Sequence, residues 1–435
     1  MAFGGGVFTS QNKELPGAYI NFVSAAGANA SLSERGIATM PLELDWGIDN
    51  AVFEVTAEDF MKNSLKIFGY PYTHEKMKGL RDLFRNARIL YAYKLTSSGT
   101  KASNVFAQAL YAGIRGNNLK IVIRKNADNE ELFDVQTLFD GAEVDMQTVS
   151  KADELIDNEF VSFIKNAELA VTAGTALESG TNGTVDGTAY QKYLDLIEAY
   201  SFNTMGVSVT DETTKALFSA FVKRLRDEMG IKFQLVVHNH AADYHGIVNV
   251  KNSVSDSGWN VASLVYWVTG ICAGCEVNKS NQNKIYDGEF SIDAQYTQNQ
   301  LRNAIKSGEF VLHQVGTDMR VLDDINSMTT VSDALGEDFK SNQTIRVLDQ
   351  IANDIAVLFN TKYLGTVAND EAGRISLWSD IVKHHQQLAE IRAIENFSDS
   401  DIVVSQGEAK KSVVVSDAVT IINAMSKLYM TVTVS

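Results

Sequence analysis

Segments typical of strands and of amphipathic helices alternate from Tyr190 to about Leu335. The run IKFQLVV at 231–237 has the apolar character of a buried strand. The run TTKALFSAFVKRLRDEMG at 213–230 follows a helical pattern that stops at a glycine, and a second, more apolar helix is expected at 260–275. Because strands connected through helices pair in parallel, this alternation predicts an α/β domain with a largely parallel sheet.

Different patterns precede this domain. Residues 105–165 contain short strand-like runs separated by Asn, Asp and Gly, which predicts a β-sandwich or a small barrel. The Gly/Thr-rich stretch at 172–189 is expected to be a linker or an exposed loop. Earlier, AVFEVTAEDF at 51–60 predicts a strand that runs into a helix, with Thr56 as the N-cap of that helix.

The last hundred residues predict a separate unit. A helix is expected over 342–360, with Ser341 as its cap, and a second helix over 375–395. The runs DIVVS and SVVVS, joined by QGEAKK, predict a hairpin over 401–416.

Composition limits the classes of function. The 435 residues carry 38 Lys plus Arg against 54 Asp plus Glu, a formal net charge of -16, which argues against general binding to nucleic-acid phosphates. The sequence contains no uninterrupted stretch of about 18 apolar residues, so no membrane span is predicted. The opening residues do not have the pattern of a signal peptide. The two cysteines give no disulfide framework, so we expect synthesis in a reducing cytoplasm.

One group of polar residues resembles a metal site. The run LVVHNHAADYH delivers three histidines and an aspartate into a loop after a strand: His238, His240, Asp243 and His245. The metallohydrolase pattern HxHxDH is not met, because the aspartate comes one place late and a residue separates it from the last histidine. We therefore favour a polar loop and keep a metal-dependent hydrolase only as a distant alternative.

For two further pairs of residues we favour a role in packing over a role in catalysis or metal binding. Cys272 and Cys275 close an apolar helix, whereas a redox C-x-x-C opens one, so we expect them to pack as small hydrophobes. His384 and His385 flank an apolar helical stripe and are expected at the boundary of a core or an interface. With no nucleotide-binding or hydrolase motif found, we predict no enzyme activity, no catalytic residue, no cofactor and no metal ligand.

Strand-like segments lie towards both ends of the chain. The first is AYINFVSAA at 18–26. In the second, one face carries Leu428, Met430, Val432 and Val434, and the other carries Tyr429, Thr431 and Thr433. Each segment either pairs within its own subunit or adds a strand to a neighbour's sheet. Repeated head to tail, the second arrangement builds open helices or stacked rings, which predicts a self-assembling structural protein.

Several stretches, spread in order over nearly the whole chain, carry a family resemblance. They are TSQNKELPGAYINFVS (9–24), RGIATMPLELDWG (35–47), ALYAGIRGNNLKIVI (109–123), LESGTNG (177–183), YQKYLDLIEAYSFNT (190–204) and KLYMTVTV (427–434). Through them the chain resembles the tail sheath proteins of contractile phage tails and phage-tail-like bacteriocins of Gram-positive bacteria.

The resemblance implies an α/β multidomain fold. It comprises a subtilisin-like α/β domain with an inserted β-sandwich, an α+β C-terminal domain and extended terminal arms. No Asp/His/Ser triad signature accompanies it, so the subtilisin-like domain is expected to be non-catalytic. The implied parts are an N-terminal arm (1–26), a small α/β domain (27–95), the β-sandwich (96–183), the subtilisin-like domain (184–337), the C-terminal domain (338–425) and a C-terminal arm strand (426–435).

The resemblance also implies that both arms pair in neighbouring subunits. Carried over by position, the N-terminal arm is Tyr19, Ile20, Asn21, Phe22 and Val23, and the C-terminal arm is Leu428, Tyr429, Met430, Thr431, Val432, Thr433 and Val434. Residues 24–36 are expected to be the N-terminal hinge. The two C-terminal helices, 342–360 and 375–395, are both candidates for contact with an inner tube.

The implied function is mechanical. Subunits would assemble in the host bacterial cytoplasm as stacked hexameric rings around a tube protein, with baseplate and tail terminator proteins as further partners. Contraction of this sheath in the virion or phage-tail-like particle would drive the tube through a target cell envelope. Neither nucleic acid nor membrane insertion is part of this function. A different self-assembling structural protein is the nearest alternative.

Overall fold

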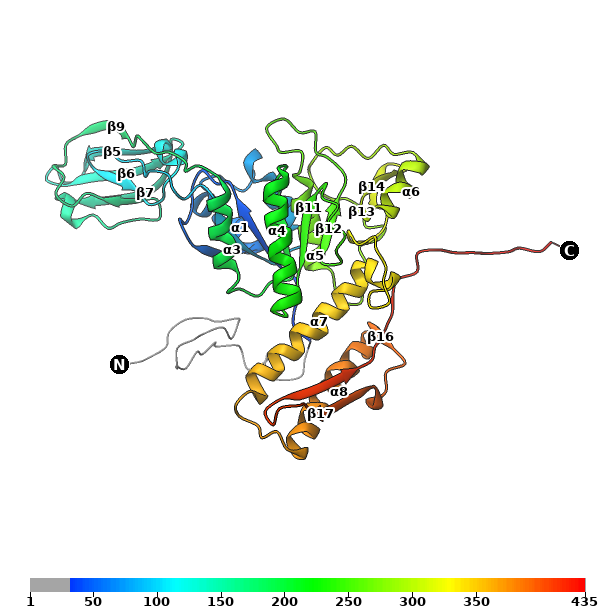
Figure 1. Cartoon of the computed structure of the whole chain (residues 1–435). Helices are drawn as coiled ribbons and strands as arrows, with labels where there is room; N and C mark the ends of the chain where they lie inside the picture. The colour runs from blue at the N-terminus through cyan, green and yellow to red at the C-terminus, as the bar shows by residue number, and fades with distance from the viewer. Residues whose placement is uncertain (1–31, 435) are drawn as a thin grey trace. The chain divides into compact units, whose positions relative to one another are not determined.

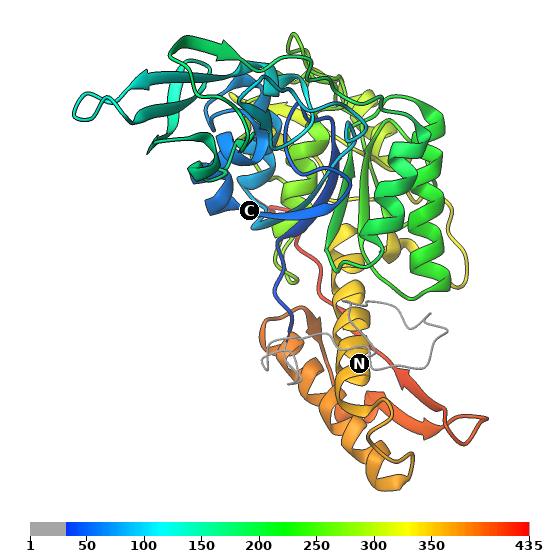
Figure 2. The ribbon, with the colours of Figure 1, turned by 90° about the vertical axis from the view of Figure 1, so that its left-hand side faces the viewer.

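The computed structural model describes residues 32–434 (Figures 1 and 2). They form two compact units, one of residues 32–38, 82–88 and 199–434, the other of 39–81 and 89–198. The expected strand Tyr19–Val23 and the first part of the expected hinge, 24–31, lie outside the described residues.

The first unit contains the predicted parallel sheet. Its strands are β10 (Thr204–Val207), β11 (Gln234–His238), β12 (Ile247–Val250) and β13 (Glu309–Phe310), which lie side by side and parallel. Helices α4 (Glu212–Lys223) and α5 (Leu264–Gly274) pack against this sheet, as Figure 1 shows. The mostly apolar sequence of α5 is explained by its burial, and the α/β expectation is confirmed for this region.

The same unit ends in an α+β part that contains both predicted helices. They are α7 (Asn342–Leu358), which continues into a π-helical turn η7 (Phe359–Tyr363), and α8 (Glu371–Glu390). The predicted hairpin is confirmed: β17 (Ile402–Gln406) pairs antiparallel with β18 (Val413–Asp417), and α8 packs against β17. Figure 2 shows the two helices and the hairpin together.

The second unit begins with a small α/β part. Here β3 (Ile89–Lys94) lies between β1 (Ile37–Leu42) and β2 (Val52–Thr56). Helix α1 (Ala57–Phe68) starts at Thr56, whose side chain accepts a hydrogen bond from the Asp59 N–H, as the cap pattern predicted.

The β-rich part of this unit consists of two antiparallel sheets. One has the order β7 (Ala142–Val149), β6 (Phe133–Phe139), β5 (Leu119–Lys125), β9 (Thr172–Ala176). The other pairs β4 (Ala107–Ala109) with β8 (Val161–Phe163). They share an apolar core that includes the buried Trp46.

The stretch 172–189 is not simply a linker or loop, which corrects the sequence-based expectation. Its first five residues form β9 and pair with β5, and its last three begin helix α3 (Gly187–Ile197). The threonines of this stretch favour a strand, although glycines surround them. The strand forms because it pairs with β5, which is distant in the sequence.

The remaining elements complete these parts. They are η2 (Glu75–Met77), α2 (Lys78–Phe84), η3 (Ile114–Asn118), η4 (Ala152–Glu154), the π-helical turn η5 (Arg224–Glu228), α6 (Gln298–Lys306), β14 (Leu312–Val315), β15 (Asp318–Val321), η6 (Glu337–Lys340), β16 (Ile394–Glu395), η8 (Asp399–Asp401) and β19 (Thr420–Ile421). Within the described part of the chain, no helix is long and apolar enough to cross a membrane.

Candidate functional site

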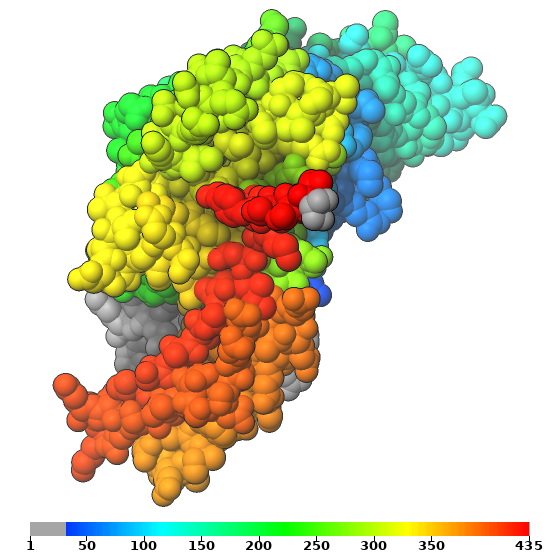
Figure 3. Space-filling model, turned by 90° about the vertical axis from the view of Figure 1, so that its right-hand side faces the viewer, coloured from blue at the N-terminus to red at the C-terminus, as the bar shows by residue number. Residues whose placement is uncertain are grey.

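The segment after β19 is extended and exposed. No strand is assigned within residues 422–434, and the side of the segment with Leu428, Met430 and Val434 is 75–90% exposed. Figure 3 shows this red segment standing on the surface of the molecule. A strand needs a partner for its backbone N–H and C=O groups, and the described residues of this chain do not supply one. The structure therefore presents an apolar, strand-competent segment without a strand partner in the described chain.

The beginning of this segment is held firmly by the start of α7. The side-chain amide of Gln343 accepts a hydrogen bond from the Ala424 N–H (2.9 Å) and donates one to the Ile422 carbonyl (3.1 Å). Asn423 interacts with the hydroxyls of Ser341 and Thr344 on the same helical turn. We call residues 422–424 with these partners the C-terminal anchor.

The first described residues are held by the same helix further along. The Ser33 hydroxyl donates to a carboxylate oxygen of Asp354 at 2.5 Å, and Gln350 donates to the Ser33 hydroxyl at 2.6 Å. The backbone N–H of Leu32 donates to the side chain of Gln387 on α8 at 3.2 Å. We call residues 32–33 with these partners the N-terminal anchor.

The expected hinge over 24–36 does not extend through residues 32–36. Besides the N-terminal anchor, Arg35 donates to the carbonyls of Cys272 and Cys275, and the Gly36 N–H donates to the Asn203 side chain. Each contact involves a residue distant in sequence. The polar, Gly-containing composition of this stretch predicts a hinge because such long-range contacts cannot be recognised from local sequence.

The hairpin offers an open strand edge. The Gly407 N–H donates to the Ser412 carbonyl at 2.9 Å, and the antiparallel ladder alternates from there. The alternation directs the backbone groups of Val413, Val415 and Asp417 away from β17. No described strand lies on this side of β18. β18 can therefore accept an added strand.

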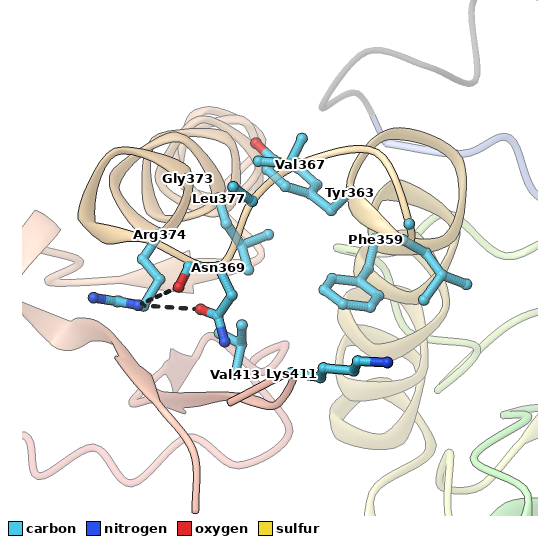
Figure 4. A pocket seen from close by; sticks show the side chains of 12 residues that line it. Phe359, Tyr363, Val367, Asn369, Gly373, Arg374, Leu377, Lys411 and Val413 are labelled. Carbon is cyan, nitrogen blue, oxygen red and sulfur yellow. Dashed lines mark hydrogen bonds between the residues drawn. The ribbon is translucent and has the colours of Figure 1, made fainter. Parts of the chain in front are cut away.

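A shallow pocket lies beside the start of β18 (Figure 4). Its walls come from the π-helical turn η7, the loop after it, the start of α8 and the hairpin, and include Phe359, Tyr363, Leu377 and Val413. Arg374 donates to the carbonyl and side chain of Asn369 at 3.1 Å on its rim. The pocket is mostly apolar, which suits an aliphatic side chain from an added strand rather than a polar substrate.

The His/Asp group at 238–245 does not form a metal site. His238 lies 3.2 Å from the Ser253 hydroxyl, and His240 lies 2.7 Å from the Ser219 hydroxyl. Asp243 instead accepts hydrogen bonds from Thr329 and Thr330, which hold the pKa of its carboxyl far below the usual value. Among the residues that the structure describes, no three His, Cys, Asp or Glu side chains are placed to hold a metal ion.

Cys272 and the paired histidines are interior residues, whereas Cys275 is half-buried. Burial raises the pKa of both thiols, and Cys272 is completely buried. His384 and His385 are buried in α8, where His384 Nε2 lies 3.0 Å from Asp354 and His385 Nε2 lies 3.0 Å from Asp417. The sequence predicts these histidines at the boundary of a core or an interface, but the fold buries both of them completely inside the core.

Sequence reasoning missed the buried polar face of α7. The buried polar residues of this helix are Asn342, Gln343, Thr344, Arg346, Asp349, Gln350 and Asp354. The apolar stripe is the stronger pattern in this helix, although polar residues at positions 342, 346 and 349 also recur at helical spacing. A polar stripe of this kind predicts specific partners, because buried polar groups are hydrogen-bonded.

Comparison with known proteins covers nearly the whole chain. Four family models match in succession: tail sheath protein Gp18 domain III N-terminal region (35–95), phage tail sheath protein beta-sandwich domain (94–182), phage tail sheath protein central domain (183–327) and phage tail sheath C-terminal domain (335–435). The phage-like element PBSX protein XkdK of Bacillus subtilis is 31% identical over 99% of this chain and 100% of its own length.

The chain belongs to the phage tail sheath proteins. A solved sheath tail protein from Desulfitobacterium hafniense superposes with a TM-score of 0.82 at 35% identity, over 95% of this chain and 99% of that one. A helical sheath of the anti-feeding prophage in its contracted state superposes with a TM-score of 0.59 at 12% identity, over 97% and 99%, and shares the fold. The mixed α/β sheath fold with a β-sandwich domain is thus shown, and the chain has a structural rather than a catalytic family background.

Proposed function

We propose that this sheath protein polymerises as stacked hexameric rings around an inner tube and contracts to drive that tube through a target cell envelope. The observation that carries the proposal is the exposed apolar segment Leu428–Val434, which has no strand partner in the described chain. In a tail sheath protein, an exposed apolar segment of this kind is suited to join subunits rather than to remain in water.

The C-terminal segment is proposed to pair in another copy. Its acceptor would be the open edge of β18, where the backbone groups of Val413 and Val415 face outwards. An apolar side chain of the added strand would enter the pocket lined by Phe359 and Tyr363. A segment and an acceptor at different places on one molecule make a heterologous contact, which repeats into rings and helices.

The N-terminal arm, Tyr19–Val23, is proposed to make a second link between subunits. Two backbone-paired links per subunit would keep neighbours connected while the rest of the interfaces repack on contraction. The extended sheath would be a kinetically trapped state that a baseplate trigger releases.

Several finer assignments belong to the same proposal. We propose that the central α/β domain is subtilisin-like in topology and non-catalytic, and that the domain boundaries are those implied by the family resemblance. The partners would be other copies, the tube protein, and the baseplate and terminator proteins. Assembly would take place in the host bacterial cytoplasm. The metal-dependent hydrolase is not favoured, since the residues at 238–245 turn to separate partners.

The decisive experiment compares the full-length protein with a version that ends at Lys427. Light scattering after size-exclusion chromatography measures assembly, and negative-stain microscopy identifies cylinders. We expect hollow cylinders from the full-length protein, and a folded monomer from the truncated one, because residues 428–434 contribute no strand to their own subunit. Irregular polymers would favour another self-assembling protein. An unfolded truncated protein would contradict the assembly role of the segment.

A further inference from the structure

Helix α7 takes part in both the N-terminal anchor and the C-terminal anchor. Gln343 in its first turn binds residues 422 and 424, while Asp354, three turns later, binds Ser33. Asp354 comes eleven positions after Gln343, and at 1.5 Å per residue the two anchors are about 16 Å apart along the helix axis. A helix of this length bends little, so both anchors, where the two terminal segments leave the folded domain, are held on one rigid helix.

The N-terminal anchor converges on one buried carboxylate. Asp354 accepts hydrogen bonds from the Ser33 hydroxyl (2.5 Å), the Ser33 N–H (3.3 Å) and Gln350 Nε2 (2.8 Å), and it lies 3.0 Å from His384 Nε2. Hydrogen bonds to an ionised acceptor are the stronger kind, and four groups from three segments fix its geometry. Asp354 therefore holds the incoming chain against both α7 and α8.

The same helix is also fastened to the α/β domain. Asp324 accepts from the Asn342 side chain at 3.0 Å, and Arg346 Nη2 approaches it at 3.3 Å in a position that excludes solvent. One turn further on, Asp349 pairs with Arg226 from the segment after α4. Helix α7, which carries both anchors, therefore cannot rotate independently of the α/β domain.

We infer that α7 fixes the directions of the two terminal arms relative to each other, with Gln343 and Asp354 as its positioning residues. This inference rests on the proposed function, because it concerns arms that engage two different neighbours. Two linked contacts reinforce each other only when the geometry allows both at once. A released arm still pairs, but the subunit no longer imposes one relation between its neighbours, and the assembly loses regularity.

The variants are chosen to separate positioning from folding. Asp354→Asn and Gln343→Met disturb the anchors from the helix side. Ser33→Ala and Asn423→Ala disturb them from the exposed chain and leave α7 intact, which keeps the test valid if a helix variant fails to fold. Gln386→Ala is the matched control, since Gln386 is exposed on α8 next to the anchoring Gln387.

Two measurements on full-length protein report the anchors directly. Trypsin cleavage after Arg35, followed by mass spectrometry, should accelerate at least tenfold in Asp354→Asn and Ser33→Ala, with cleavage elsewhere in the α/β domain unchanged. Spin labels at Met425→Cys and Lys383→Cys, in a Cys275→Ser background, should give a narrow distance distribution that broadens in Gln343→Met and Asn423→Ala. Gln386→Ala should match the parent protein in both.

Microscopy then tests the consequence for assembly. We expect cylinders from the parent protein and from Gln386→Ala to give sharp layer lines. Anchor variants that remain folded should associate into polymers whose layer lines are weak or absent. Parent-like layer lines, or parent-like cleavage and distance distributions, in variants at both anchors would overturn the inference alone. A parent protein that forms no cylinders would instead contradict the proposed function, while the cleavage and distance measurements would still decide whether the anchors fix the exits.

Discussion

The two terminal nitrogens of Arg226 lie 2.7 and 2.8 Å from the two carboxylate oxygens of Asp349. The side chains are only 3% and 9% exposed, so this bidentate pair joins α7 to the segment after α4 in the absence of water. Arginine suits such a site because its planar fork matches a carboxylate. The pair fixes the orientation of α7 more than it adds stability, since desolvation offsets much of the attraction.

Removing one partner of this pair should be far more costly than removing both. Asp349→Ala leaves a buried guanidinium without its counter-charge and should lower the free energy of unfolding by about 3–5 kcal/mol. Arg226→Met with Asp349→Leu should cost much less, because no unpaired charge is left. Urea unfolding followed by tryptophan fluorescence measures both. The exposed pair Lys62–Glu58 is the control, and Glu58→Ala there should change the free energy by less than about 1 kcal/mol.

Two glycines with positive φ should differ sharply in their tolerance of alanine. Gly113 has φ +131°, and an added Cβ would lie 2.0 Å from the Asp45 carbonyl oxygen, so Gly113→Ala should destabilise the second unit by more than about 4 kcal/mol. Gly141 has φ +83° with open space around the Cβ position, so Gly141→Ala should cost only about 1–2 kcal/mol. Equal costs, measured by thermal unfolding, would contradict the packing described around Gly113.

Asp82 should make stability depend on pH between about 4 and 6. Burial raises the pKa of this carboxyl from 3.8 to about 6, although the Tyr286 hydroxyl donates to it at 2.7 Å and Arg85 lies nearby. Since the folded pKa exceeds the unfolded one, the stabilisation is complete below pH 3.8 and is lost as pH rises through 6. The difference between the two values corresponds to about 3 kcal/mol.

Asp82→Asn provides the measurement of this effect. The difference in free energy of unfolding between the parent protein and the variant should favour the parent at pH 4 and shift by up to about 3 kcal/mol towards the variant at pH 7. Urea titrations at intermediate pH values would trace the change. A difference that stays constant with pH would show that Asp82 keeps an ordinary pKa in the folded protein.

The two faces of the C-terminal segment should respond differently to charge. Val432 is 70% exposed in the described chain, so Val432→Asp should leave the fold intact within about 0.5 kcal/mol. We expect it to abolish cylinder formation, because the apolar face would be buried on β18 of another copy. Thr431→Asp places the same charge on the opposite face and should still assemble. Loss of assembly in both variants would show that both faces are buried.

Local pattern predicted much of the fold because its causes are local. The cap at Thr56, the start of α7 after Ser341 and the β17–β18 hairpin all depend on residues a few positions apart, and all are present in the structure. The stretch 172–189 was mispredicted as a linker or loop, since β9 becomes a strand only by pairing with β5. Residues 32–36 were likewise mispredicted as part of a hinge.

The sequence by itself determined the alternation of strands and helices, the apolar faces of the terminal segments and, through stretches along the whole chain, the sheath family. Only the tertiary structure decided the partners of the polar residues on α7. Arg226 meets Asp349 across 123 positions and Ser33 meets Asp354 across 321. Periodicity shows which side of a helix is buried, but the identity of a buried polar partner depends on how distant segments fold together, and no local pattern encodes it.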